Sequence, residues 1–325
     1  MVTSLPNGLL DPPVSLTELK HKRGRRRTWR ATGADGATAI VKVYASDRAP
    51  VVAARVAALR AGPRPPRVPE VLHADPARHL VVLTDVPGAP LGDAVLAGDQ
   101  DGCRHAGEAL GAWHGWWRGR SPVPLRPHTA ARELEVLLRR AETAPPTIGP
   151  TVARMAPRLA EPWPCPTVVH RDLYEDQVLL GAGGEVGLID LDDAALGPAE
   201  LDVGNLIAHL DLLALRTGRS VDQPRTELLG GYLSAGAPLD RSLLARCRRL
   251  SLLRLACIHA EPRLLELAEA QWDSSTPSSR KSAKRPPAPG PTKTTDADPA
   301  IPAEPGMTTL RTLAGSMETA RRPSR

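Results

Sequence analysis

The stretch 167–205 has the chain's densest set of residues that could do chemistry. It reads TVVHRDLYEDQVLLGAGGEVGLIDLDDAALGPAELDVGN. Asp172 and Gln177 are predicted to lie in a loop, and Asp190 follows Asp172 by 18 residues, enough for a strand, a turn and a return strand. Such a hairpin would bring Gln177 and Asp190 to one end, where an amide and a carboxylate oxygen suit Mg²⁺. Asp172 would stand nearby as a potential base for a hydroxyl nucleophile.

Short apolar runs flank this loop and must position it. The segments 167–169, 177–180 and 185–189 are predicted strands, and the GAGG sequence at 181–184 is predicted to join the last two into a hairpin. The hairpin interrupts a region that otherwise has helical periodicity.

The remaining elements form two groups, on either side of a turn-rich hinge at 85–91. Strands at 28–31, 38–44 and 80–84 and a helix at 51–61 come before it. After it, apolar spacing predicts helices at 103–118, 130–142, 201–215, 223–235 and 241–271. We predict an α+β, bilobal chain with a small β-rich lobe at 1–84 and a larger helical lobe at 92–272. The Pro-, Ser- and Thr-rich basic segment 273–325 is expected to be a disordered tail.

Several motifs together resemble a known family. His170, Arg171 and Asp172, with Gln177 five positions on, resemble the H-R-D-x-x-x-x-N catalytic loop, and the IDLD sequence at 189–192 resembles the metal-binding segment of the protein kinase-like fold. The GPAELD, VPGAPL and LGAWH sequences at 197–202, 86–91 and 110–114 resemble the aminoglycoside phosphotransferase and choline kinase-like family. Because the chain has neither an A-P-E segment nor a G-x-G-x-x-G loop, protein kinase activity is not favoured.

The resemblance, over roughly 16–270, implies a role for each matching residue. Asp172 would be the catalytic base or orient the substrate hydroxyl, and Asp190 would bind Mg²⁺ that bridges the nucleotide phosphates. Gln177 stands where the family usually has Asn and would be the second metal ligand. His170 and Asp202 would brace the catalytic loop, although Asp202 could equally cap the N-terminus of a helix.

Lys42 is singled out by the chain's own composition. It is the only lysine between Lys22 and Lys281 in a sequence with six lysines and 36 arginines, and it interrupts the apolar strand TAIVKVY. An ammonium differs from a guanidinium fork in shape and hydration, so the exception suggests a specific function. The resemblance implies that Lys42 contacts the α- and β-phosphates of ATP. A lysine on the solvent face of a strand is the alternative.

The acidic partner expected for Lys42 is missing. In the kinase-like fold a glutamate on the next helix usually pairs with that lysine, yet 48–61 contains no acid. Asp47, Glu70 or Asp190 could substitute, or the lysine could be positioned only when nucleotide binds.

The segment 22–27 precedes the first strand and has five cations and one glycine. Its position is that of a nucleotide-covering loop, so Arg25 and Arg26 are predicted to contact phosphate oxygens. A solvated basic loop is the alternative.

Charge is unevenly distributed within the net +6. The segment 19–30 has seven cations and no acid, whereas 172–215 has ten acids and no lysine or arginine. Such a pattern favours a basic lid over an acidic catalytic region rather than a nucleic-acid-binding surface. Glu175, Asp176, Asp192 and Asp193 could attract a cationic substrate such as an amine-bearing sugar, or they could be solvated loop carboxylates.

Other classes of protein are not favoured. No apolar run approaches the roughly 20 residues of a membrane-spanning helix, and prolines and an acid replace the apolar core of a signal peptide near the N-terminus. The four cysteines have no zinc-site spacing. We expect a cytoplasmic protein without a membrane or nucleic-acid partner.

The expected activity is transfer of the γ-phosphoryl group of ATP (or GTP), with Mg²⁺, to a hydroxyl of a small molecule. The acceptor class stays open among aminoglycoside-, amino alcohol- and sugar-like compounds. The missing helix acid and Gln177 leave a second hypothesis, a weak or inactive nucleotide-binding pseudokinase that acts as a regulator. A nucleic-acid binder that uses the basic tail is a third.

Overall fold

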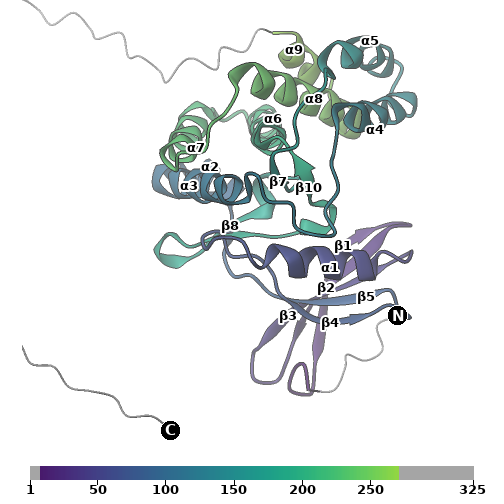
Figure 1. Cartoon of the computed structure of the whole chain (residues 1–325), viewed down its shortest axis with the longest axis vertical. Helices are drawn as coiled ribbons and strands as arrows, with labels where there is room; N and C mark the ends of the chain where they lie inside the picture. The colour runs from purple at the N-terminus through teal and green to yellow at the C-terminus, as the bar shows by residue number, and fades with distance from the viewer. Residues whose placement is uncertain (1–7, 271–325) are drawn as a thin grey trace, which may run out of the picture. The chain divides into compact units, whose positions relative to one another are not determined.

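The N-terminal lobe is an antiparallel sheet of five strands with one helix packed against it (Figure 1). The computed structural model describes residues 8–270. The strands run in the spatial order β1-β2-β3-β5-β4. They are β1 (Ser15–Lys22), β2 (Arg26–Thr32), β3 (Thr38–Tyr44), β4 (Val71–Asp75) and β5 (Leu80–Thr84), and the helix is α1 (Ala49–Leu59).

Strand β3 divides its side chains between two environments because successive residues of a strand face opposite sides of the sheet. On one face of the sheet, Ala39 and Val41 are fully buried and pack with Leu80 and Val82 of β5. Ile40, Lys42 and Tyr44 face the other side, toward α1 and the second lobe. The strand therefore presents Lys42 at the boundary between the lobes.

Two small sheets follow the hinge. One has the order β6-β8-β9, and the other pairs β7 with β10. Their bounds are β6 (Ala89–Pro90), β7 (Thr167–Val169), β8 (Val178–Leu180), β9 (Val186–Leu188) and β10 (Ala195–Gly197), with short 3₁₀ turns at η1 (Glu175–Gln177), η2 (Ala182–Gly184) and η3 (Leu191–Asp193). The loops between these strands contain most of the predicted site.

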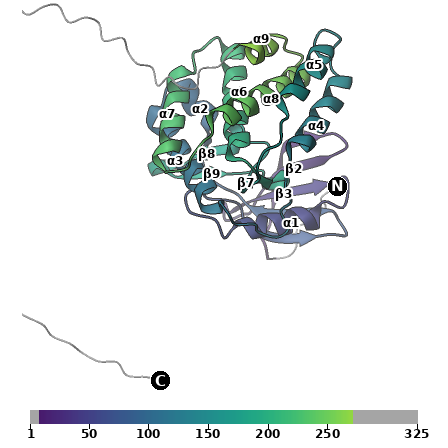
Figure 2. The ribbon, with the colours of Figure 1, turned by 45° about the horizontal axis from the view of Figure 1, so that its top comes forward.

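Helices make up the rest of the second lobe. Helix α6 is buried on nearly all sides: Leu206 and Leu210 belong to the main core, while Ala208 and Leu212 belong to a second core. Figure 2 shows α6 between α3 and α7 on one side and α8 and α9 on the other. The helices are α2 (Leu91–Ala97), α3 (Gln100–Trp117), α4 (Ala130–Glu142), α5 (Gly149–Leu159), α6 (Ala199–Thr217), α7 (Asp222–Ser234), α8 (Arg241–His259) and α9 (Arg263–Glu269).

The predicted α+β, bilobal class is confirmed, with local differences. The single helix expected over 241–271 is two helices, because Ala260 has a left-handed φ of 52° and Pro262 follows it. The turn-rich segment 85–91 contains β6 and the first residue of α2. The predicted tail at 273–325 lies outside the described residues.

Six strands and helices were not predicted, namely β1, β4, β6, β10, α2 and α5. Strand β1 has no buried residue and therefore no apolar alternation to detect, and α5 contains Pro157. Within residues 8–270, no helix is both long and apolar enough to cross a membrane.

Candidate active site

The loop after β7 is fixed by hydrogen bonds to Asp202 in the first turn of α6. The Asp202 carboxylate accepts hydrogen bonds from the backbone N–H groups of His170, at 2.6 Å, and Arg171, at 2.8 Å. The His170 ring is 2.7 Å from the main-chain oxygen of Ile189, and the Asp172 N–H donates back to the ring at 3.3 Å. The loop is thereby fixed from His170 to Asp172.

Asp202 does not cap α6, since the N-cap position is Pro198. Its carboxylate is also 3.2 Å from His114 Nε2, and both side chains are 1% exposed. Burial would raise the pKa of Asp202, but the hydrogen bond and charge of His114 lower it. The buried carboxylate is therefore kept as a hydrogen-bond acceptor for the loop.

A second support for the loop was not predicted from the sequence. Asn205 Nδ2 donates to the main-chain oxygen of Leu173 at 2.6 Å, and Asn205 Oδ1 accepts from Arg254 of α8. Arg254 in turn lies 3.6 Å from the buried Glu133 of α4. A detectable signal existed, because Asp202 and Asn205 are three residues apart and so share one face of α6.

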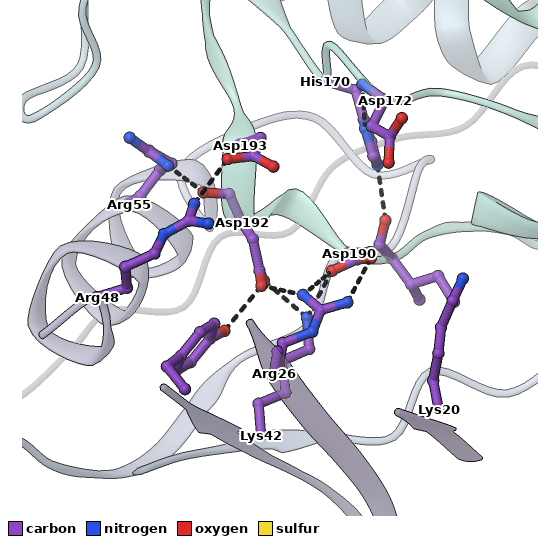
Figure 3. Close-up of polar contacts among 12 residues, drawn as sticks. Lys20, Arg26, Lys42, Arg48, Arg55, His170, Asp172, Asp190, Asp192 and Asp193 are labelled. Atoms are coloured by element: carbon purple, nitrogen blue, oxygen red, sulfur yellow. Dashed lines mark hydrogen bonds and ion pairs between the residues drawn. The ribbon is translucent and has the colours of Figure 1, made fainter. Parts of the chain in front are cut away.

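Asp190 lies at the end of the hairpin and faces two N-lobe cations (Figure 3). Its backbone is left-handed, with φ 61°, and the chain turns there into η3. Arg26 donates to both carboxylate oxygens, at 2.7 and 2.9 Å, and Lys42 Nζ donates at 2.9 Å. Burial would raise the pKa of Asp190, but Lys42 and Arg26 hold it well below the usual value.

Lys42 has a second carboxylate partner. It is 4% exposed, and its Nζ donates to Asp192 Oδ1 at 2.7 Å. Burial works against the charged form, but the charges of Asp190 and Asp192 raise the pKa of Lys42. Of the three substitutes considered for the helix acid, Asp190 contacts the lysine. Asp47 instead lies 3.1 Å from His79, and Glu70 pairs with Arg60 and Arg64 at 3.1 and 3.2 Å.

A cleft of about 730 Å³ separates the N-lobe sheet from the hairpin. Apolar side chains from both lobes line it, together with Lys42, Gln177 and Asp190. Thr84 at the end of β5 and the hinge residues 85–88 also line it. The volume and the mixture of apolar and polar lining are typical of a site for a small organic ligand.

Gln177 and Asp190 together fit a divalent cation. Gln177 is 4% exposed, and its Oε1 has no hydrogen-bond partner among the described residues. A buried acceptor without a partner is unusual and would be satisfied by a cation. No cluster of three or more His, Cys, Asp or Glu ligands occurs within residues 8–270. A cation here would depend on ligand and water oxygens for the rest of its coordination, as Mg²⁺ commonly does.

The predicted basic loop is the turn of the β1–β2 hairpin, over the acids of the second lobe. A smaller cavity lies beneath it and is lined by Lys22, Arg25, Arg26 and Asp172. Arg26 and Asp190 line both cavities, so the cavity of Asp172 adjoins the large cleft. Lys20 Nζ also donates to the Tyr174 hydroxyl at 3.1 Å, which links β1 to the loop after β7.

The four acids predicted to attract a cationic substrate do not lie together. Asp176 is exposed and lines the large cleft. Glu175 is partly buried 3.6 Å from His209, and burial raises its pKa to about 7. Asp193 Oδ1 accepts from Arg48 at 2.6 Å, and Asp192 is 3% exposed against Lys42. Asp192 and Asp193 thus face cations of the N-lobe, which the sequence alone could not indicate.

The fold and the site define a bilobal, kinase-like protein with an interlobe ligand cleft. A family model described as "Phosphotransferase enzyme family" matches residues 15–241, and the chain belongs to this family. The predicted resemblance and the prediction of a phosphotransferase enzyme are thereby confirmed.

Solved structures of the same fold have low sequence identity to the chain. An amicoumacin kinase in complex with AMP-PNP, Ca²⁺ and Ami has a TM-score of 0.58 at 17% identity, covering 83% of this chain and 85% of that chain. A choline/ethanolamine kinase family protein from Mesorhizobium loti has a TM-score of 0.55 at 19% identity, covering 79% and 82%. The aminoglycoside phosphotransferase APH(3'')-Id from Streptomyces rimosus has a TM-score of 0.54 at 19% identity, covering 74% and 92%. No curated protein matches.

Proposed function

We propose that the protein transfers the γ-phosphoryl group of ATP (or GTP), in a Mg²⁺-dependent reaction, to a hydroxyl of a small molecule. One observation supports this most directly. Lys42, Arg26, Asp190 and the unpartnered Gln177 oxygen converge in one cleft, and Asp172 lies in the adjoining cavity. Cations for phosphate, oxygens for a metal and a carboxylate for a hydroxyl are the groups that phosphoryl transfer requires.

The nucleotide would lie in the large cleft, with its base against the apolar residues near the hinge and its phosphates toward Lys42, Arg25 and Arg26. Asp190 and Gln177 would hold Mg²⁺, which when bound supplies positive charge to the phosphate oxygens. Arg26 now occupies both oxygens of Asp190. It would exchange from Asp190 onto phosphate as nucleotide enters, because a guanidinium fork fits phosphate as well as carboxylate.

In the transfer step, the acceptor oxygen forms a bond to the γ-phosphorus, and the bond between that phosphorus and the bridging oxygen of ADP breaks. Asp172 orients the attacking hydroxyl and takes its proton. Asp202 keeps Asp172 in place through the N–H groups of His170 and Arg171. Lys42 and the basic turn stabilise the charge on the phosphoryl oxygens.

The acceptor is proposed to be an aminoglycoside-, amino alcohol- or sugar-like compound. Proteins of similar fold are named as a macrolide 2'-phosphotransferase, an aminoglycoside phosphotransferase and a choline kinase. Asp176 is the predicted acid best placed to meet a cationic group, since it is exposed at the cleft. The requirement for ATP is consistent with a cytoplasmic location.

Nucleotide turnover against a panel of alcohols, with the wild type and Asp172→Ala, tests the assignment. We expect kcat for the accepted alcohol to fall by roughly 10²- to 10⁴-fold in Asp172→Ala, because general base catalysis contributes about that much. The dissociation constant of Mg·AMP-PNP should stay within error. Glu185→Gln, at the exposed residue that follows η2, is the control. Equal phosphoryl transfer by Asp172→Ala and the wild type would remove Asp172 as the base.

A nucleotide-binding pseudokinase is the second candidate. It is favoured by Gln177 at the usual Asn position and by Arg26, which covers Asp190. The missing helix acid no longer favours it, because Lys42 has two carboxylate partners. Stabilisation by Mg·AMP-PNP in a thermal melt, without turnover on any alcohol, would select the pseudokinase.

A further inference from the structure

Helix α1 contributes positive charge, whereas pairing with Lys42 would require a negatively charged residue. Its sequence, APVVAARVAAL, contains no acid. Arg48 at its N-cap donates to Asp193 Oδ1 at 2.6 Å, and Arg55 within it donates to the main-chain oxygen of Asp192. Figure 3 shows both arginines directed from the helix toward η3. The helix therefore holds an acidic segment in place instead of supplying an acid.

Asp192 is surrounded by cations and hydrogen-bond donors that neutralise its negative charge. One oxygen accepts from Lys42 at 2.7 Å, and the other accepts from the Tyr44 hydroxyl at 2.8 Å and from Arg26. Lys42 and Tyr44 are two residues apart on β3 and so lie on the same face of the strand. A carboxylate that is only 3% exposed is costly to bury unless it is hydrogen-bonded, and here both oxygens are.

Asp190 and Asp192 differ in their access to the cleft. Asp190 lines the large cleft beside Gln177, whereas Asp192 lines the smaller adjoining cavity and not the large cleft. A metal or phosphate in that cleft would therefore compete for the oxygens of Asp190. The contact between Lys42 and Asp192 is the one that can persist when nucleotide is bound.

We propose that Asp192 is the positioning residue for Lys42 and replaces the carboxylate that α1 lacks. Helix α1 acts through Arg55, which fixes the backbone of Asp192, so the lysine is held by η3 rather than by the helix. The role assigned to this pairing, which is to orient Lys42 toward the nucleotide phosphates, rests on the proposed function. The pairing itself can be tested without nucleotide.

The test compares Asp192→Asn, Asp192→Glu and the control Glu185→Gln, which makes the same chemical change on an exposed turn. Reductive methylation of each lysine is followed by mass spectrometry without nucleotide, with Lys20 and Lys22 as internal references. Asp192→Asn should raise the labelling rate of Lys42 severalfold and leave the two references unchanged. The dissociation constant of Mg·AMP-PNP should rise by roughly tenfold, since a lost charged hydrogen bond is worth about that much.

Asp192→Glu should partly restore slow Lys42 labelling and tight nucleotide binding because it returns the negative charge.

Tyr44→Phe provides a second variant if circular dichroism shows that Asp192→Asn does not fold. This substitution removes one hydrogen-bond donor to Asp192 and should raise Lys42 labelling to a smaller extent. Unchanged Lys42 labelling in a folded Asp192→Asn, or in Tyr44→Phe if that is the folded variant, overturns the proposal. Raised labelling in a protein whose wild type binds no nucleotide supports the pairing and overturns the proposed function instead.

Discussion

Single carboxylates of the segment 172–193 have very different surroundings, although they are close in sequence. Asp190 receives hydrogen bonds from Arg26 and Lys42, whereas Glu175 has one buried oxygen without a hydrogen-bond partner among the described residues. His209, whose ring lies 3.6 Å from Glu175, has its pKa lowered to about 3 by burial, so it brings no positive charge at neutral pH. Burial correspondingly raises the pKa of Glu175 to about 7.

Glu175→Gln is expected to stabilise the protein at alkaline pH. The folded-state pKa lies above the ordinary 4.5, so the folded protein binds more protons than the unfolded chain between pH 4.5 and about 7. The free energy of unfolding of the wild type therefore contains a contribution that falls as pH rises through this window. The glutamine has no charge to bury. The free energy of unfolding of Glu175→Gln should therefore exceed that of the wild type by about 1–3 kcal/mol at pH 8 and equal it at pH 4.5. Urea denaturation at both pH values measures this, with Glu185→Gln as control.

A difference between Glu175→Gln and the wild type that is the same at pH 4.5 and pH 8 would contradict the buried, uncharged Glu175. The matched glutamine at the exposed position 185 should show no pH-dependent difference.

At the scale of elements, α3 and α7 approach so closely that only glycine fits at their contact. A Cβ on Gly107 would lie 2.0 Å from the main-chain oxygen of Leu228, and one on Gly231 would lie 2.1 Å from that of Arg104. Helix α3 also supplies His114, which hydrogen-bonds Asp202. The packing of these helices is therefore linked to the position of the loop after β7.

Two adjacent glycines of α7 allow a matched test of this packing. Gly231→Ala should lower the free energy of unfolding by about 1–3 kcal/mol, because backbone atoms must move apart to admit the methyl group. At Gly230 a Cβ meets nothing within 4 Å, so Gly230→Ala should raise stability by about 0.5–1 kcal/mol through helix propensity. Chemical denaturation of both variants gives the comparison. Equal effects at the two positions would show that α3 and α7 are farther apart than described.

At the scale of the whole molecule, the lobes meet through oppositely charged groups. Arg26, Lys42 and Arg48 of the N-lobe pair with acids of the 190–193 segment. The basic and acidic blocks that are separate along the sequence are thus adjacent in space. The chain's charge asymmetry is used within the molecule, between the lobes.

Hydrogen exchange should report nucleotide binding in both lobes at once. Both β3 and the β8–β9 hairpin line the large cleft, so Mg·AMP-PNP is expected to slow exchange in peptides covering 26–44 and 177–193. Helices α5 and α9 contribute no residue to the cleft and serve as internal controls. Protection confined to one lobe would contradict a ligand bound between them.

The sequence alone predicted much of the fold and the makeup of the site. Strong local patterns identified β3, β5 and most helices, and the spacing of Asp172, Gln177 and Asp190 predicted the loop and hairpin. Elements without apolar periodicity, such as β1, were missed because nothing local distinguishes them. Support from Asn205 and Arg254 was missed because it depends on helix packing.

What the sequence by itself determined was which residue types stand near one another along the chain, and hence the family and the class of chemistry. Only the tertiary structure decided which of those residues are partners. Lys42 and Asp192 are 150 positions apart, and no spacing rule relates a strand of one lobe to a turn of the other. Whether a carboxylate is free to meet a substrate or is already neutralised depends on burial and on nearby charge, which are properties of the folded molecule.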